Sequence, residues 1–278
     1  MVGLLAGALV ALVILGGAKR IGAVAEYLIP VMSLGYIALS LGVLLRNAGA
    51  VPGALQSIFA GAFSPKAFTG GAVGSAFLTL RIGVSRGVFT NEAGLGTSAM
   101  AHGAAEVDYP ARQGMWGIFE VFFATLLTCT LTALVILVGG VYQPETVLSQ
   151  LRQGMLPDWA LGVPLTARSF SAVLGEAGAW IVWISLLLFA FSSILGWSYY
   201  GQQSLRFLTG GDHLLPLYRA VFLGCVVLGA CGNSAGLWQL VDLCNALMAI
   251  PNLLALLLLA PQALRLLREW IGQQNAPV

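Results

Sequence analysis

Residues 83–96 read Gly-Val-Ser-Arg-Gly-Val-Phe-Thr-Asn-Glu-Ala-Gly-Leu-Gly. They lie within residues 69–105, a mainly apolar segment that is too long for one membrane span of about 20 residues. Each glycine weakens a helix by roughly 1 kcal/mol relative to alanine. An ionisable side chain such as Arg86 or Glu92 costs at least ~2.5 kcal/mol at membrane depth unless it is paired or faces water. This combination predicts a discontinuous helix whose broken backbone lines a polar cavity.

The alternative interpretation is a cytoplasmic loop between two short helices, with Arg86 and Glu92 in water. We favour the broken helix because its apolar flanks, Gly71–Leu80 and Leu95–Ala105, are each too short to cross a membrane. Free N–H groups at such a break can hold a carboxylate, and free C=O groups can hold a cation. We therefore expect the backbone to leave helical geometry within Arg81–Gly94.

The composition of the whole chain also indicates a membrane protein. Of its 278 residues 58% are hydrophobic and 9% are charged, and the mean hydropathy is +0.89. A soluble domain has about a quarter of its residues charged. Lipid admits only helical bundles and closed β-barrels, and long apolar runs such as Leu4–Gly17 and Leu253–Ala260 differ from the alternating strands of a barrel. The sequence predicts an all-α polytopic bundle, a single transmembrane domain over residues 1–278.

The apolar segments predict where the helices lie. We expect spanning helices near residues 2–18, 23–45, 69–105, 112–139, 178–207, 214–231 and 235–266, the last being one long helix or two that meet at Pro251-Asn252. Residues 51–64 and 164–177 are shorter and amphipathic, as is typical of helices at the membrane interface. Basic residues at alternate helix junctions predict the cytoplasmic side: Lys19, Arg20, Arg112 and Arg206.

Several classes of function are excluded by what the sequence contains. A net charge of +2 gives no basic surface for nucleic acid. The cysteines lie in or beside apolar runs, which favours buried thiols over disulfides or metal ligands: Cys129, Cys225, Cys231 and Cys244. The sequence shows no nucleophile–base pair, metal-ligand spacing or phosphate loop, so we expect neither an enzyme nor a cofactor.

A second candidate site lies at residues 189–201, Phe-Ala-Phe-Ser-Ser-Ile-Leu-Gly-Trp-Ser-Tyr-Tyr-Gly. Ser192 and Ser193 offer hydroxyl oxygens, which small hard cations prefer. Trp197 follows them by five and four residues, on roughly the same helix face. Close packing of small residues between membrane helices explains the serines equally well. Three further polar side chains either pair with neighbours or line a pathway: Glu120, Asp242 and Asn245.

Three motifs closely resemble those of the alanine/glycine:cation symporter family. Residues 86–96 resemble the family's RG-x-F-S/T-NEAG-x-G motif, residues 191–201 and 247–253 resemble its later motifs, and the resemblance extends from about Gly16 to Leu264. It implies a five-plus-five inverted-repeat fold with a cation-coupled amino-acid site at mid-membrane. One departure is Ala124-Thr125, where the family often has an Asp-Thr pair.

On that template the helices at 2–18 and 23–45 resemble the fourth and fifth core helices. The broken helix resembles the sixth, and the helix at 178–207 resembles the eighth. The first three core helices are then expected to be absent from this chain, which alone is expected not to catalyse coupled transport.

The resemblance also implies roles for individual residues. Substrate-binding positions are Gly83, Phe89, Thr90, Asn91, Gly94 and Trp197; cation ligands are Ser192 and Ser193; and a buried charge pair is Arg86 with Glu92. Arg86 or Arg81 is the nearest candidate partner of Glu92.

The implied function is sodium-coupled symport of alanine or glycine across the cell (plasma) membrane by alternating access, with proton coupling a less favoured variant. The expected partners are the amino acid, the sodium ion and membrane lipid, with no metal other than the transported cation. The alternatives are a truncated, non-transporting membrane remnant or scaffold and, more weakly, a membrane-embedded enzyme.

Overall fold

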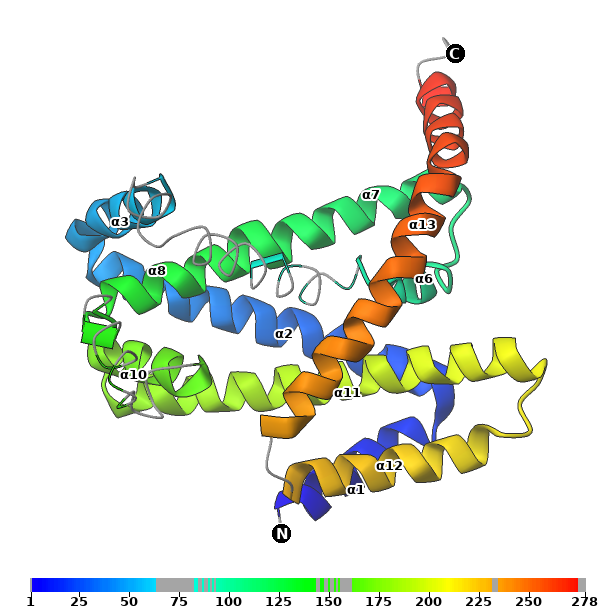
Figure 1. Ribbon diagram of the computed structural model, residues 1–278, viewed down its shortest axis with the longest axis horizontal. Helices are drawn as coiled ribbons and strands as arrows, with labels where there is room; N and C mark the ends of the chain where they lie inside the picture. The colour runs from blue at the N-terminus through cyan, green and yellow to red at the C-terminus, as the bar shows by residue number, and fades with distance from the viewer. Residues whose placement is uncertain are drawn as a thin grey trace. The chain divides into compact units, whose positions relative to one another are not determined.

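The computed structural model describes residues 2–63, 83–84, 87, 90, 92, 94–143, 146–147, 150, 153, 155, 162–231 and 235–274. Within these residues every continuous element of regular structure is a helix (Figure 1), which confirms the all-α prediction. The elements are α1 (Val2–Ile14), α2 (Gly17–Arg46), η1 (Ala48–Ala50), α3 (Val51–Phe63), α6 (Thr97–His102), α7 (Pro110–Val121), η2 (Phe122–Cys129), α8 (Thr130–Val138), α10 (Gly162–Leu174), α11 (Glu176–Thr209), α12 (Leu215–Cys231) and α13 (Ala235–Gln274).

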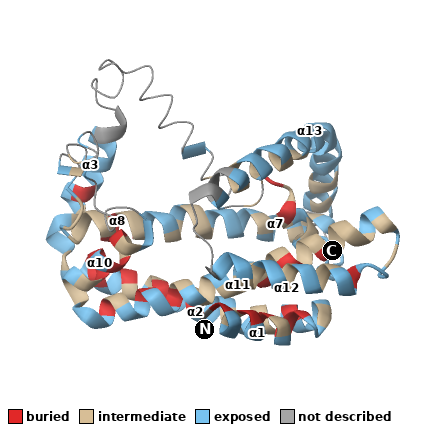
Figure 2. Ribbon diagram, turned by 60° about the horizontal axis from the view of Figure 1, so that its bottom comes forward, coloured by how far each residue is buried: buried red, intermediate tan, exposed pale blue. Residues whose placement is uncertain are grey.

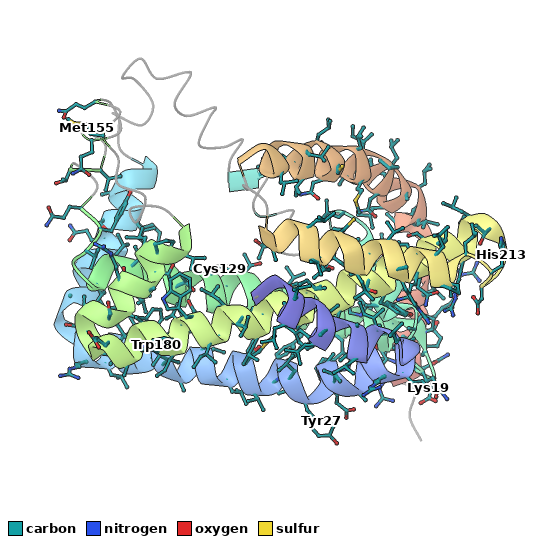
Figure 3. The ribbon with its side chains drawn as sticks, turned by 90° about the horizontal axis from the view of Figure 1, so that it is seen from below. Lys19, Tyr27, Cys129, Met155, Trp180 and His213 are labelled. Carbon is teal, nitrogen blue, oxygen red and sulfur yellow. The ribbon has the colours of Figure 1, made fainter. Side chains whose placement is uncertain are left out.

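The helices have the length and surface of membrane spans. Among the described residues, four are long and apolar enough to cross a membrane: Gly17–Arg46, Pro110–Val138, Glu176–Thr209 and Leu240–Gln273. Large apolar side chains are exposed along them, including Leu258 at 80% (α13 is mostly pale blue in Figure 2). Tyr27 likewise points away from α2 (Figure 3). Such a surface is stable only in lipid, so the chain is a multi-pass membrane protein.

Most helix boundaries lie within a few residues of the predicted ones, but α2 begins at Gly17 instead of near residue 23, and the C-terminal helix also differs. α13 is one helix that contains both Pro251 and Pro261, so the alternative of two short helices is wrong, and it continues to Gln274. Proline is tolerated within membrane helices because neighbouring groups satisfy the freed backbone. α10 ends before Gly175, whose φ of 71° suits a residue without a Cβ.

The cysteines differ from expectation. The three that the structure describes with their surroundings, Cys129, Cys225 and Cys244, are free, as predicted, but exposed. The expectation of buried thiols is therefore wrong for them. A residue within an apolar run suits an apolar environment. In a membrane bundle the lipid-facing surface is such an environment, as well as the interior.

The chain divides into two compact units. Unit 1 contains Met1–Gly7, Leu78–Leu126 and Tyr200–Val278, and unit 2 contains Ala8–Phe77 and Leu127–Tyr199. The continuous helix made of α7, η2 and α8 contributes residues to both units, and so does α11. Because each unit combines distant stretches of sequence, both depend on long-range packing. The expected single domain over residues 1–278 stays a prediction.

Unit 2 has its core around α8, which packs against α2, α3 and α10. The buried core residues are Tyr36, Val43, Leu44, Ala54, Leu131, Leu134, Val135, Ala167, Phe170 and Val182. Two glycines let α10 lie close to its neighbours: a Cβ at Gly139 would lie 2.9 Å from the Ser169 carbonyl oxygen, and one at Gly178 would lie 2.8 Å from that of Phe170. The close approach places α10 against α8 and α11.

Unit 1 is built around α7, which packs against α6 and α13. Tyr109, just before α7, donates a hydrogen bond of 3.2 Å to Glu269 of α13, and Arg265 donates one of 2.7 Å to the same carboxylate. The pKa of Tyr109 is raised, first by loss of surrounding water and second by its hydrogen bond to Glu269. On the other side of the unit, Arg219 of α12 donates two hydrogen bonds, 3.0 and 2.9 Å, to Gln202 of α11.

Candidate functional site

The backbone breaks where residues 83–96 predict it. Gly83 and Thr90 are helical, but Glu92 has a φ of 53°, and the chain turns through Gly96, with a φ of 83°, before α6 begins at Thr97. The prediction that helical geometry ends within Arg81–Gly94 is confirmed at Glu92. A non-glycine residue with this φ is uncommon and stays there only when its surroundings hold it.

Hydrogen bonds within the turn hold Glu92 in place. Its carbonyl oxygen accepts from the backbone N–H groups of Leu95 (2.9 Å) and Gly96 (3.1 Å). Its carboxylate accepts from the Thr97 hydroxyl at 3.2 Å. Thr97 and Leu95 are buried, at 2% and 4% exposure. The packing of these two residues therefore fixes the C-terminal end of the turn. Glu92 thus has a hydroxyl as a hydrogen-bonding partner.

Asn252 of α13, far from this turn in the sequence, forms a hydrogen bond with it. Its side-chain amide donates a hydrogen bond of 2.9 Å to the carbonyl oxygen of Gly94. A Cβ at Gly96 would lie 2.8 Å from the Asn252 side-chain oxygen, so the glycine is needed for the close approach as well as for its φ. The sequence analysis assigned Asn252 no role. The feature of the sequence that could have indicated a role was an amide side chain directly after Pro251 in a mainly apolar helix.

Three predicted site residues, Arg86, Phe89 and Asn91, lie outside the described residues, as does Arg81. The pairing of Arg86 with Glu92 therefore stays a prediction. Of the expected substrate positions in this segment, Gly83 and Thr90 are exposed, and Gly94 is half-buried with its carbonyl bonded to Asn252.

The predicted residues of α11 lie in unit 2. The Ser192 hydroxyl donates to the Phe189 carbonyl at 2.9 Å and lies 3.9 Å from the sulfur of Met32 on α2, so it faces the interior of the unit. Its oxygen keeps lone pairs that can bind a cation. Ser193 is exposed, and Trp197 is half-buried.

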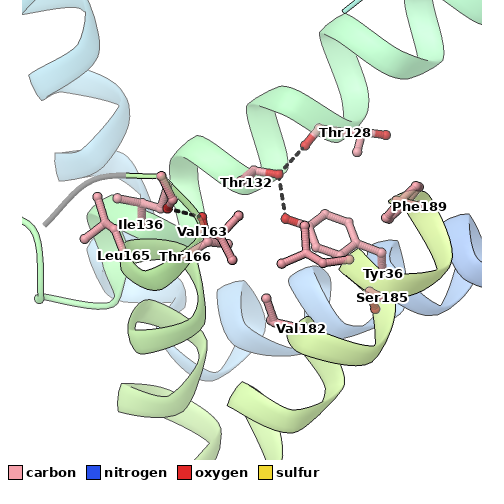
Figure 4. A pocket seen from close by; sticks show the side chains of 12 residues that line it. Tyr36, Thr128, Thr132, Ile136, Val163, Leu165, Thr166, Val182, Ser185 and Phe189 are labelled. Carbon is pink, nitrogen blue, oxygen red and sulfur yellow. Dashed lines mark hydrogen bonds between the residues drawn. The ribbon is translucent and has the colours of Figure 1, made fainter. Parts of the chain in front are cut away.

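A cavity of about 540 Å³ lies in unit 2 between α2, the continuous helix of η2 and α8, α10 and α11, and Ser192, Ser193 and Trp197 are not among the residues that line it. Figure 4 shows the hydroxyls of Tyr36 and Thr132 pointing toward one another, 2.7 Å apart. Thr132 donates its single hydrogen to the Thr128 carbonyl (2.8 Å), so Tyr36 is the donor to Thr132. Phe189 meets the Tyr36 ring edge-on at 6.1 Å. The sequence analysis missed this cavity because its wall comes from four distant helices.

The helix that carries Thr128 also contains an unexpected element. η2 is a π-helix over Phe122–Cys129, inserted between α7 and α8. It includes Ala124-Thr125, the position where the chain departs from the related motif. A π-helical segment changes which side chains share a face, and such segments occur often at functional sites.

The predicted site residues thus fall into two sets. Ser192, Ser193 and Trp197 belong to unit 2, and the turn from Glu92 to Gly96 belongs to unit 1. The first set contains hydroxyl groups and the second a broken backbone, and the roles predicted for both sets in binding cation and substrate stay predictions. A single cation and substrate site made from both sets stays a prediction.

A multi-pass helical bundle with a backbone break beside polar residues is the architecture of secondary transporters. The chain belongs to the sodium:alanine symporter family, whose sequence model matches residues 1–277.

Individual relatives agree with this assignment. The chain is 39% identical over 250 residues to the sodium/alanine symporter AgcS of Methanococcus maripaludis, covering 90% of this chain and 52% of the relative. It is 33% identical over 274 residues (99% and 54%) to the probable sodium/glutamine symporter GlnT of Bacillus subtilis. It is 32% identical over 269 residues (94% and 59%) to the sodium/proton-dependent alanine carrier protein of Bacillus sp. PS3. The chain therefore spans about half the length of the curated relatives it matches. The family and these relatives are named as transporters, not as enzymes.

Proposed function

We propose that the protein carrying this chain is a sodium-coupled symporter of small neutral amino acids, alanine first and glycine second, in the cell membrane. The match of residues 1–277 to the sodium:alanine symporter family is the observation that carries the proposal. The name of the Methanococcus relative, a sodium/alanine symporter, supports alanine and sodium.

We assign different roles to the two sets of polar groups, cation binding to one and amino-acid binding to the other. The Ser192 and Ser193 hydroxyls supply two of the roughly six oxygens that a hard cation prefers, and further ligands come from carbonyl groups or the substrate carboxylate. The broken segment around Glu92 supplies backbone groups for the amino acid. The resemblance assigns Phe89 and Trp197 as aromatic walls that limit the size of the substrate, and of these two the structure describes only Trp197. Joint binding of cation and substrate precedes alternating access.

The experiment is uptake of labelled amino acids by proteoliposomes that contain the whole gene product. With an inward sodium gradient we expect alanine and glycine to accumulate, and replacement of sodium by potassium to abolish accumulation. Unlabelled glutamine serves as a competitor that tests substrate size, because one relative is a probable sodium/glutamine symporter. Uptake that ignores the sodium gradient contradicts the coupling. Absence of any uptake contradicts the transport function and favours a scaffold.

A further inference from the structure

A second group of polar residues lies in unit 1, away from the turn at Glu92. His102, the last residue of α6, contacts two side chains of α7. Its Nε2 lies 3.1 Å from a carboxylate oxygen of Glu120, and its Nδ1 lies 2.8 Å from the amide nitrogen of Gln113. The His102 side chain is 27% exposed and that of Glu120 is 62% exposed, and a cavity of about 400 Å³ is lined by both.

The geometry assigns the tautomer of His102. The amide nitrogen of Gln113 can only donate, so Nδ1 of His102 accepts and carries no proton. The ring proton is then on Nε2, which donates to Glu120. Nδ1 is consequently the position where a further proton can be added.

The surroundings suit the protonated ring as well. The resulting imidazolium would face the Glu120 carboxylate through Nε2–H. A half-turn of the Gln113 amide would present its oxygen to Nδ1–H, so both ring N–H groups would be satisfied. Gln113 and Glu120 lie two helical turns apart on one face of α7, and the ring packs over Gly117 between them, where a Cβ would lie at an ordinary contact distance of 3.5 Å from Nε2.

Other charged groups on the neighbouring elements have partners of their own. Arg265 of α13 pairs with Glu269, which also accepts from Tyr109; Arg112 pairs with Asp108; and Arg206 of α11 pairs with Asp212. The remaining charged residues of these elements and of the connecting turns are Glu92, Glu106, Glu176, Arg219, Asp242 and Arg268. Glu120 lies about 15 Å along a 29-residue apolar helix that begins at Pro110, where an unpaired charge is costly.

We infer that His102, with Glu120 and Gln113, forms a proton-binding site that ties α6 to α7. An imidazole can bind a second proton near neutral pH, which is the chemistry of the proposed site. Protonation converts a neutral–anion contact into an ion pair and strengthens the link between the two helices. Because α6 begins directly after the turn at Glu92–Gly96, the protonation state of His102 is coupled to the segment in which the backbone breaks.

The direct test is nitrogen NMR of the whole protein in nanodiscs, with the histidine side chains labelled. The chain has two histidines, and the other, His213, lies on the turn between α11 and α12 (Figure 3). His102→Gln and His213→Gln therefore assign the two signals. We expect the signals of His102 to change from the Nε2–H tautomer at high pH to the doubly protonated ring at low pH. The Nδ1–H tautomer at high pH, or a ring that never takes up a second proton, would overturn the proposal in the unmodified protein.

Two acid variants test the role of Glu120. Glu120→Gln removes the carboxylate that faces Nε2 of His102, so we expect the titration midpoint of His102 to be lower in this variant. Glu106→Gln, in the turn before α7, is the matched control and should leave the midpoint unchanged. An unchanged midpoint in Glu120→Gln, or an equal shift in Glu106→Gln, contradicts the site.

A consequence for transport rests on the proposed function. Sodium-driven alanine uptake should vary between about pH 5.5 and pH 7.5 in the unmodified protein and in His213→Gln, and this variation should be lost in His102→Gln. Loss of the variation in both histidine variants, or in neither, contradicts the coupling to transport. If the unmodified protein takes up no alanine, the proposed function fails while the NMR titration still decides the proton site.

Discussion

At the scale of single residues, the turn at Glu92 is held by contacts that each involve a specific atom. Gly96 combines a positive φ with a close approach to Asn252. We expect Gly96→Ala to lower the free energy of unfolding by about 1–2 kcal/mol through backbone strain and overlap. Gly42→Ala in α2 is the control, because open space surrounds Gly42 and alanine favours the helix. Thermal unfolding in detergent measures both; equal stability of the two variants would show that the turn is not strained.

Asn252 is predicted to position the same turn. Asn252→Ala removes the hydrogen bond to the Gly94 carbonyl, a loss of about 1 kcal/mol, and should lower alanine uptake more than protein level. Gln262→Ala, at an exposed amide of the same helix, is the matched variant and should leave uptake unchanged. A parallel fall of uptake and protein level in Asn252→Ala would reduce its role to stability.

The hydroxyls of α11 give a prediction about sodium. Changing Ser192 and Ser193 together to alanine removes two proposed cation ligands, so the sodium concentration for half-maximal uptake should rise by roughly tenfold, equivalent to about 1.4 kcal/mol. Ser171→Ala is the control, because that hydroxyl donates to the Arg168 carbonyl of its own helix. An unchanged sodium dependence in the double variant refutes the assignment, whereas a changed one in Ser171→Ala shows a general effect.

Residue-level features differ in how well the sequence reveals them. The break at Glu92 was predictable because glycine density and buried charge act within a few residues. The bond from Asn252 to Gly94 joins positions 158 apart, and no local pattern specifies it. Glu120 was noticed as a rare acid in an apolar helix, but its partner His102 could only be found once α6 and α7 were placed together.

At the scale of elements, the packing of α10 depends on glycines. Gly178→Ala would place a Cβ 2.8 Å from the Phe170 carbonyl oxygen and push α10 away from α11. We expect a loss of about 1–3 kcal/mol in the free energy of unfolding, as for other overpacked contacts. Gly35→Ala, at an exposed position of α2, is the matched control. Equal unfolding midpoints would show that α10 adjusts freely.

Element positions were largely predictable, and element type was less so. Apolar length alone located α2, α11 and α12, and the amphipathic segments at 51–64 and 164–177 matched α3 and α10. The π-helix η2 was not predicted because its residues have ordinary helical propensity. Its hydrogen-bond pattern depends on packing at both ends.

At the scale of the whole molecule, the sequence of a protein that lies in lipid says less about which helices pack together than about where the helices are. Positions that face lipid and positions that face another helix are both apolar, so the pattern that locates a helix does not specify its partners. The exposed cysteines of the three helices that carry Cys129, Cys225 and Cys244 illustrate the point. The five-plus-five inverted repeat, which concerns partners, stays a prediction from the resemblance.

The last prediction links sodium to the stability of the molecule. A ligand that binds only the folded state stabilises it by about 2.7 kcal/mol at a hundred times its dissociation constant. If Ser192 and Ser193 bind sodium, the ion should raise the thermal unfolding midpoint of the purified whole gene product, and potassium at equal ionic strength should not. Alanine added with sodium should raise the midpoint further, because the two ligands bind jointly. The double serine variant should lose most of the sodium shift, while Ser171→Ala keeps it. Equal shifts with sodium and potassium would show a general salt effect and contradict a sodium site.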